Sequence, residues 1–280
     1  MTKFPFQKIL ALFIIGHATI TTPLIEKCRR HNVFIAVMKP NLRPVFCFSN
    51  NAEANYLLRE RQYKFDKDDI SIGKKLVQNK ITNQVKLLKS TRRKDELTTK
   101  SIESCEQALD ILTEVKSLRD LMGLEGFAAK MFFNAYYQDL EWVQRLPRMK
   151  CDEINVILDI GYTILFNFVE TFVRMFGFDI YRGVFHRVWF KRKSLICDLV
   201  EPFRCIIDRQ VRKSFNLGQF NKKQFKLVKD EYVLNFDACS EYYNTFYKAL
   251  IVYKSEIFKY IQFYYRYFMN NNNPFPEFYI

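Results

Sequence analysis

The chain has 280 residues, 49% of them hydrophobic, which is enough to bury a sizeable core without disulfides or metals. Its 44 Lys and Arg against 30 Asp and Glu give a net charge of +14, which favours a polyanionic partner, nucleic acid before an anionic membrane. The seven cysteines contain no C-x-x-C pair, which argues against zinc fingers and disulfide scaffolds and indicates reduced, buried thiols in a cytoplasmic protein.

The first fifty residues have the pattern of a small β-rich unit. Apolar runs at 8–15, 33–38 and 44–49 predict three strands. Residues 21–32 predict a short helix between the first two, because a Thr-Pro pair suits its first turn. The first apolar run resembles a signal peptide, but it is short and no small-x-small cleavage site follows, so we expect a buried strand.

From about residue 51 the pattern becomes helical, with apolar residues at 3.6-residue spacing over 52–65 and 70–89. Residues 152–176 have the length of a membrane span but carry several polar side chains, which favours a buried amphipathic helix. The remaining predicted elements are a polar loop at 91–100, one or two helices at 101–140, a loop at 146–152, a turn at 177–183, helices at 194–215 and 222–229, and an aromatic helix at 235–269.

Together these elements predict an α+β protein: a small N-terminal β-rich domain followed by a larger all-α-helical domain. We place the β-rich domain at 1–62, the helical domain at 63–268 and a loose C-terminal tail at 269–280. The sequence shows no internal repeat and no glycine-rich phosphate loop.

The positive charge is concentrated in two segments. Residues 61–100 carry 12 Lys and Arg against 5 acidic residues, and residues 182–229 carry 13 against 3. Part of the lysine and aromatic content matches what AT-rich codons favour, but codon bias does not explain this clustering. The second segment also contains His186, Asp198 and Glu201.

Asp198 and Glu201 are three residues apart on a predicted helix and therefore lie on one face. Two carboxylates so placed repel unless a cation lies between them. The neighbouring lysines and arginines could supply that cation, and so could a divalent metal ion. Pro202 disfavours helical geometry at Glu201, so we expect the helix to kink there.

Two more side chains could join this pair. His186 follows a turn that ends in Gly183, and a return of the chain would bring its imidazole to the carboxylates. Glu125 is a lone acid on a small, apolar helical face and needs a partner inside the protein. One histidine with carboxylates suits Mn²⁺ or Mg²⁺ better than structural zinc, although a structural histidine and a solvated acid pair remain open.

Four segments carry a resemblance to a known family: "LMGLEGFAAKMFF", "DEINVILDIGYTIL", "GFDIYRGVFH" and "SLICDLVEPFR". In this order and spacing they resemble the CRISPR-associated spacer-acquisition integrases, the Cas1 family. The resemblance implies an N-terminal β domain and a helical catalytic domain. Members have further strands before the segment matching "KILALFIIG", so we expect the β domain to be shortened at its start.

The resemblance also implies the site residues. Glu125, His186 and Glu201 correspond to the family's metal ligands for Mg²⁺ or Mn²⁺, and Asp198 corresponds to a supporting catalytic position close to the metal. Five basic residues flank these acids and are candidates for holding DNA phosphates. They are Arg187, Lys191, Arg192, Lys193 and Arg204.

The implied function is a metal-dependent DNA endonuclease and integrase that inserts captured DNA fragments into a CRISPR array. The implied partners are double-stranded DNA (protospacer and CRISPR repeat), a second copy of the chain and the small Cas2 protein, in the cytoplasm and without a membrane. The alternative from the residues alone is a non-catalytic, basic nucleic-acid-binding helical protein, whose aromatic side chains could stack on bases.

Overall fold

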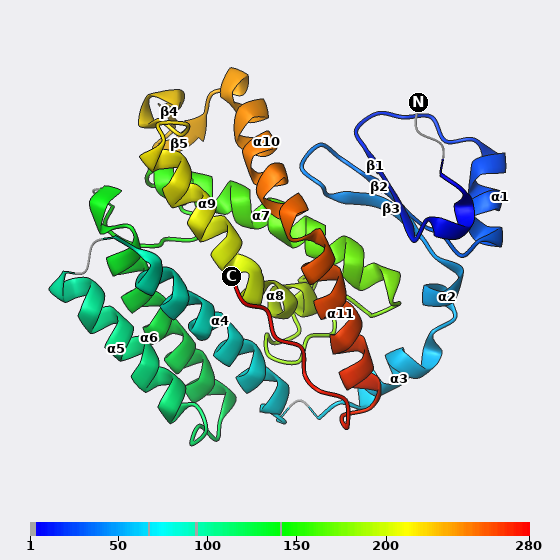
Figure 1. Ribbon diagram of the computed structural model, residues 1–280, viewed down its shortest axis with the longest axis horizontal. Helices are drawn as coiled ribbons and strands as arrows, with labels where there is room; N and C mark the ends of the chain where they lie inside the picture. The colour runs from blue at the N-terminus through cyan, green and yellow to red at the C-terminus, as the bar shows by residue number, and fades with distance from the viewer. Residues whose placement is uncertain (1–3, 67, 93–94, 141) are drawn as a thin grey trace.

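The computed structural model describes residues 4–66, 68–92, 95–140 and 142–280 of the chain. A small sheet with one helix lies at one end, and a larger, mostly helical part makes up the rest (Figure 1). The predicted fold class, a small N-terminal β-rich region followed by a larger helical one, is therefore confirmed.

The N-terminal sheet has three strands in the order β1-β2-β3, with β1 and β2 parallel and β2 and β3 antiparallel. Side chains of the central strand alternate between two buried faces. Ile35 packs against the helix that connects the first two strands, and Phe34 and Ala36 face the helical part. The elements are β1 (Ala11–Ile15), α1 (Thr22–Arg30), β2 (Phe34–Met38) and β3 (Pro44–Phe48).

The rest of the chain is mainly helical, with one small hairpin. The helices are α2 (Asn50–Glu53), α3 (Tyr56–Lys64), α4 (Ser71–Ser90), α5 (Glu96–Ile111), α6 (Leu118–Tyr136), α7 (Glu153–Met175), α8 (Ser194–Val200), α9 (Arg204–Asn216), α10 (Phe236–Val252) and α11 (Lys254–Met269). The hairpin strands are β4 (Phe225–Val228) and β5 (Glu231–Leu234), and four short 3₁₀ turns are η1 (Phe6–Lys8), η2 (Gln138–Leu140), η3 (Glu201–Phe203) and η4 (Lys222–Gln224).

Helix α7 is the central helix of the larger part and packs against β3, α8, α9, α10 and α11 (Figure 1). By length and composition it could cross a membrane, and it is the one helix in the described part of the chain that could. However, 72% of its most apolar stretch is buried inside the protein, as the sequence prediction of a buried helix requires.

Helices α4, α5 and α6 pack against one another, and α4 also contacts α8, η3 and α9. This arrangement brings three segments that are far apart in the sequence to one place. They are the middle of α4, the middle of α6 and the junction between α8 and α9.

Three predictions of local structure are wrong. Residues 222–229 form η4 and the first hairpin strand, because Lys229 and Asp230 both adopt positive φ (52° and 62°) and close a two-residue turn. The aromatic helix at 235–269 is two helices, broken at Tyr253. The predicted polar loop at 91–100 is helical from Glu96, where Asp95 caps α5; residues 93 and 94 lie outside the described residues.

The C-terminal segment is not the loose tail that we predicted. Phe278 is buried between Phe203 and Tyr253, and its backbone carbonyl accepts hydrogen bonds from the amides of Asn79 (2.7 Å) and Asn83 (2.8 Å) on α4. The prediction weighed the polar run of four asparagines and overlooked the apolar residues that follow it.

All seven cysteines are free, as predicted. Cys28, Cys105 and Cys205 are buried, whereas Cys151 is exposed, so the expectation of buried thiols holds only for some of them.

Candidate metal centre

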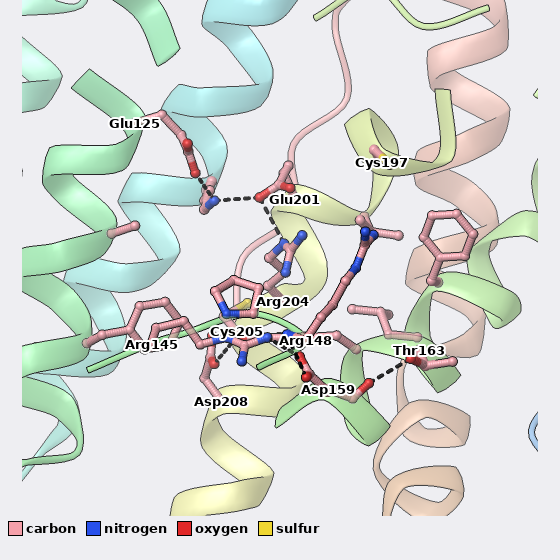
Figure 2. A pocket seen from close by; sticks show the side chains of 18 of the residues that line it. Glu125, Arg145, Arg148, Asp159, Thr163, Cys197, Glu201, Arg204, Cys205 and Asp208 are labelled. Carbon is pink, nitrogen blue, oxygen red and sulfur yellow. Dashed lines mark hydrogen bonds and ion pairs between the residues drawn. The ribbon is translucent and has the colours of Figure 1, made fainter. Parts of the chain in front are cut away.

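The centre of the site is one ammonium group held between two carboxylates. Lys80 on α4 forms ion pairs with Glu125 on α6 and with Oε2 of Glu201 in η3, the latter at 2.6 Å. Figure 2 shows the two glutamates approaching this nitrogen from opposite sides. Glu125 and Glu201, 76 positions apart in the sequence, therefore share one cation.

Local sequence explains how each side chain reaches this point. Lys80 lies four residues after the buried Leu76 and four before the buried Gln84, so it is on the inward face of α4. Glu201 begins the 3₁₀ turn that separates α8 from α9, with Pro202 as its second residue. The predicted change of helical geometry at Pro202 therefore occurs, and Glu201 is almost fully buried.

Burial would raise the pKa of the Glu201 carboxyl, but the positive charges of Arg204, Lys80 and His186 outweigh it and lower the pKa to about 2. Arg204 Nε and Lys80 Nζ both lie at ion-pair distance from Oε2 of Glu201. Both positive groups therefore compensate this buried carboxylate, and a further cation at Oε2 would have to displace one of them.

Lys80 is itself almost entirely buried, and burial would lower the pKa of its ammonium. The charges of Glu125 and Glu201 more than compensate and raise that pKa above its ordinary value. The ammonium is therefore charged at neutral pH, and the site stabilises positive charge.

Asp198 is fully buried and holds His186 in place. Its Oδ1 accepts hydrogen bonds from the His186 backbone amide and imidazole Nδ1, both at 2.7 Å, and its Oδ2 accepts from the amides of Val184 and Phe185. Because Nδ1 is engaged, Nε2 is the ring nitrogen left for a ligand. A carboxylate behind an imidazole is the arrangement that orients histidine ligands of metals.

A cavity of about 710 Å³ connects these groups. Lys80, Glu125, His186, Glu201 and Arg204 line it. Asp198 lies behind the imidazole and does not line the cavity. The structure thus gathers Glu125, His186 and Glu201 at one cavity and places Asp198 behind His186.

In the described residues, no three His, Cys, Asp or Glu side chains converge closely enough to form a ready metal-binding group. The two carboxylates meet on the ammonium of Lys80 instead. Nevertheless, carboxylates with one imidazole suit Mg²⁺ or Mn²⁺, and Glu125 and Glu201 already share one positive group. These residues therefore fit a divalent cation if the Lys80 ammonium moves aside.

A second polar group lies on the floor of the cavity. Tyr162 on α7 and Tyr137 both donate hydrogen bonds to the buried carboxylate of Asp208, and the Arg204 guanidinium lies 4.7 Å from the centre of the Tyr162 ring. Burial raises the pKa of Asp208 to about 6, against the lowering effects of the Tyr162 hydrogen bond and of Arg204.

The five predicted DNA-binding residues divide into two groups. Arg187, Lys191 and Arg192 are exposed on the segment between His186 and α8. Lys193 instead neutralises the buried Glu170 (2.7 Å), and the partly buried Arg204 pairs with Glu201 and lines the cavity.

Lys80 and Asp208 are site residues that we did not single out from the sequence. A signal existed for Lys80, because it is a lysine at a buried position of an amphipathic helix. No comparable signal existed for Asp208, whose partners come from other helices.

Comparison with known proteins places this chain in a family. The sequence model described as "CRISPR associated protein Cas1" matches residues 1–248. A CRISPR-associated endonuclease Cas1 of Thermodesulfovibrio yellowstonii is 27% identical over 82% of this chain and 75% of its own. Another, from Methanospirillum hungatei, is also 27% identical, over 80% of this chain and 65% of its own.

Solved structures share the fold. A chain of a partial Cas6-RT-Cas1–Cas2 complex superposes with a TM-score of 0.82 at 20% identity, covering 93% of this chain and 85% of that one. A casposase bound to an integration product gives 0.73 at 20% identity, over 98% and 84%. A Cas1 protein from Thermotoga maritima gives 0.73 at 18% identity, over 95% and 88%. Because the family model matches residues 1–248 of the 280 in this chain, the chain belongs to the Cas1 family of CRISPR-associated proteins.

Proposed function

We propose that this chain is a metal-dependent DNA endonuclease and integrase that inserts captured foreign DNA fragments into a CRISPR array. The observation that carries the proposal is the pair Glu125 and Glu201 holding one cation beside an imidazole anchored by Asp198. Family membership and relatives named as endonucleases support the same reading.

Glu125, His186 and Glu201 would hold Mg²⁺ or Mn²⁺, which when bound supplies Lewis-acid polarisation of a phosphate oxygen. In strand transfer, the 3′-hydroxyl oxygen of the captured fragment bonds to phosphorus in the CRISPR repeat, and the bond to the repeat's own 3′-oxygen breaks. With water in place of that hydroxyl, the same site would act as a nuclease.

The chain's own residues orient these groups. Asp198 fixes the His186 ring so that Nε2 is the free nitrogen, and Arg204 keeps Glu201 ionised. Lys80, once displaced from the carboxylates, is a point charge suited to a phosphate oxygen. Arg187, Lys191 and Arg192 are exposed on the segment that follows His186, a residue lining the cavity, and would hold backbone phosphates without reading sequence.

We further propose that the chain acts as a homodimer with the small Cas2 protein on double-stranded DNA, in the cytoplasm. Two structural neighbours are chains of Cas6-RT-Cas1–Cas2 complexes, and a third is a casposase bound to an integration product. These relationships support a Cas2 partner and a DNA substrate for this chain.

The decisive experiment is strand transfer of a labelled DNA duplex into an array plasmid with Mn²⁺, with and without Cas2. Glu125→Gln and Glu201→Gln should each abolish transfer, because each removes a carboxylate charge. Glu106→Gln, on the exposed side of α5, is the matched control and should retain full transfer.

Transfer that persists in both carboxamide variants would end the catalytic assignment. If the native chain binds DNA but shows neither transfer nor cleavage with any divalent cation, the alternative of a non-catalytic DNA-binding protein replaces it.

A further inference from the structure

Gln84 on α4 is a buried polar side chain that neither the fold nor the proposed metal site uses. It is 4% exposed and lines the cavity, one helical turn after Lys80. Its amide oxygen Oε1 is enclosed by the protein and has no hydrogen-bond donor among the described residues. An enclosed amide oxygen without a donor lowers stability, because its interaction with water is lost on folding and nothing replaces it.

The amide nitrogen of Gln84 is also without a partner in the described part of the chain, but it is not enclosed as Oε1 is. Because Gln84 borders the cavity, Nε2 is the polar atom that a bound molecule can reach. Two other buried amides of α4 differ in this respect. Asn79 and Asn83 both donate to the carbonyl of Phe278 and both accept from a backbone amide of the C-terminal segment.

Gln84 lies one turn of helix away from the two carboxylates of the site. Residues four apart on a helix share one face and are separated by about 5–6 Å. Gln84 follows Lys80 on α4 by this spacing, and Ala129 follows Glu125 on α6 in the same way; all four residues line the cavity. A group bound at the carboxylates is therefore within one helical turn of the Gln84 amide.

The charge of the cavity favours an anionic ligand. Its lining contains five basic and four acidic side chains, and a divalent cation at the carboxylates would add two positive charges. Nε2 can only donate hydrogen bonds, and the non-bridging oxygens of a phosphodiester only accept them. Nε2 of Gln84 and a phosphodiester oxygen are therefore complementary.

We propose that Nε2 of Gln84 donates a hydrogen bond to a non-bridging oxygen of one phosphodiester of the DNA bound in the cavity. This inference rests on the proposed function and adds a substrate-binding residue to it. The amide carries no charge, so it positions that phosphodiester without neutralising it. The bond also accounts for an amide at a buried position where an apolar side chain of the same shape would be at least as stable.

The test combines a variant of the protein with a chemical change in the DNA. Gln84→Met keeps the length of the side chain and removes the amide, and a methylphosphonate replaces one non-bridging phosphate oxygen by a methyl group. Labelled DNA duplexes that each carry one methylphosphonate, at a different linkage in each duplex, are bound by the native chain and by Gln84→Met. Fluorescence anisotropy in the presence of Ca²⁺, an ion that carboxylates bind, measures each Kd.

Gln84→Met should bind the unmodified duplex about 10-fold more weakly, which is the usual worth of one hydrogen bond to a charged group. At one linkage, the methylphosphonate should weaken binding to the native chain but not to Gln84→Met, because the variant already lacks the bond. Methylphosphonate effects that are equal in the two proteins at every linkage overturn the proposal.

Two further variants control for position and for the direction of the hydrogen bond. Gln78→Met changes an exposed glutamine of the same helix and should bind the unmodified duplex as the native chain does. Gln84→Glu places an acceptor where the proposal requires a donor, and it should bind at least as weakly as Gln84→Met. Native affinity in Gln84→Glu would show that the side chain accepts a hydrogen bond, and it would overturn the proposal.

The melting temperature separates binding from a structural role. Gln84→Met removes an enclosed oxygen that has no donor, so it should melt at or above the native temperature. A lower melting temperature together with native DNA affinity would show that the amide only stabilises the fold, which overturns the proposal. Failure of the native chain in strand transfer with Mn²⁺ would instead remove the proposed function, and the coupling between Gln84 and one phosphate would remain.

Discussion

The ammonium nitrogen of Lys80 lies 2.6 Å from Oε2 of Glu201, and the same ammonium contacts Glu125 across the cavity. Lys80 thus occupies the position where a cation satisfies both carboxylates. A divalent ion bound by these carboxylates would have to displace it. Metal binding and the position of Lys80 are therefore expected to be coupled.

Lys80→Met tests this coupling. The metal-free variant should lose about 3 kcal/mol of stability, because two carboxylates are left together without their cation. Mn²⁺ should restore that stability, and Mn²⁺ should bind more tightly than to the native chain, since it no longer competes with an ammonium. Urea denaturation with and without Mn²⁺, and titration calorimetry, measure both quantities.

Lys89→Met is the matched control, because Lys89 is on the same helix and forms a more exposed ion pair with Glu106. It should leave Mn²⁺ affinity unchanged. A Lys80→Met protein with native Mn²⁺ affinity would show that the ammonium and the metal do not compete.

Asp198→Asn should release the His186 ring. The carboxylate accepts from three backbone amides and from Nδ1, and an asparagine replaces one acceptor oxygen by a donor that faces two N–H groups. We expect a loss of about 2–4 kcal/mol in the free energy of unfolding from the unsatisfied groups. Chemical denaturation measures the loss, and NMR of the imidazole should show a changed tautomer equilibrium.

The comparison variant for Asp198 is Asp179→Asn, on the segment that connects α7 to α8. The Asp179 carboxylate accepts from the exposed Tyr63 and from one backbone amide, that of Tyr181. Asp179→Asn should lower the free energy of unfolding much less than Asp198→Asn and leave the NMR signals of the His186 imidazole unchanged. Equal effects of the two variants would contradict a specific role for Asp198 in orienting the imidazole.

Asp208 makes a pH-dependent prediction. Burial raises its pKa to about 6, above its ordinary value of 3.8, so protonation stabilises the folded state. That stabilisation is complete below about pH 3.8 and is lost as the pH rises through about 6. Asp208→Asn, which cannot ionise, should be more stable than the native chain at pH 8 by about 1–3 kcal/mol, with the difference vanishing near pH 4.

Denaturant titrations between pH 4 and pH 8 check this difference. Asp139→Asn serves as the control, because Asp139 is more exposed than Asp208 and pairs with Arg212 on α9, the helix that carries Asp208. A native-like pH profile in Asp208→Asn would mean that Asp208 is ionised throughout this range.

Local pattern predicted the order of the β-rich and helical parts, and it singled out acids that the structure brings to one cavity. The predicted strand at 8–15 corresponds to β1, the helix predicted at 21–32 to α1, and the buried helix predicted at 152–176 to α7. Glu125, His186, Asp198 and Glu201 stood out as polar groups in apolar or basic surroundings, and the structure places three of them on one cavity with Asp198 behind.

What the sequence did not predict depends on contacts between distant segments. The Lys-Asp turn of the β4–β5 hairpin lacks the usual Asn-Gly or Asp-Gly signal, so Phe225–Val228 was assigned to a helix. The bridge from Lys80 to Glu125 and Glu201 joins three segments, and no local pattern pairs them. The tail was predicted to be loose because the partners of Phe278 are distant in the sequence: the rings of Phe203 and Tyr253, and two asparagines on α4.

That docking site links the tail to the metal centre and gives the last prediction. Asn83 donates to the carbonyl of Pro202, which directly follows Glu201, and to the carbonyl of Phe278. Phe278→Ala should cost about 3–5 kcal/mol of stability, because it empties a buried site, and it should also weaken Mn²⁺ binding by loosening the Glu201 turn. Tyr279→Ala, at a half-exposed position beside it, should leave both quantities near native. Denaturation and Mn²⁺ calorimetry on the two variants measure the effects. Native Mn²⁺ affinity in a folded Phe278→Ala protein would show that the tail stabilises the fold without positioning Glu201.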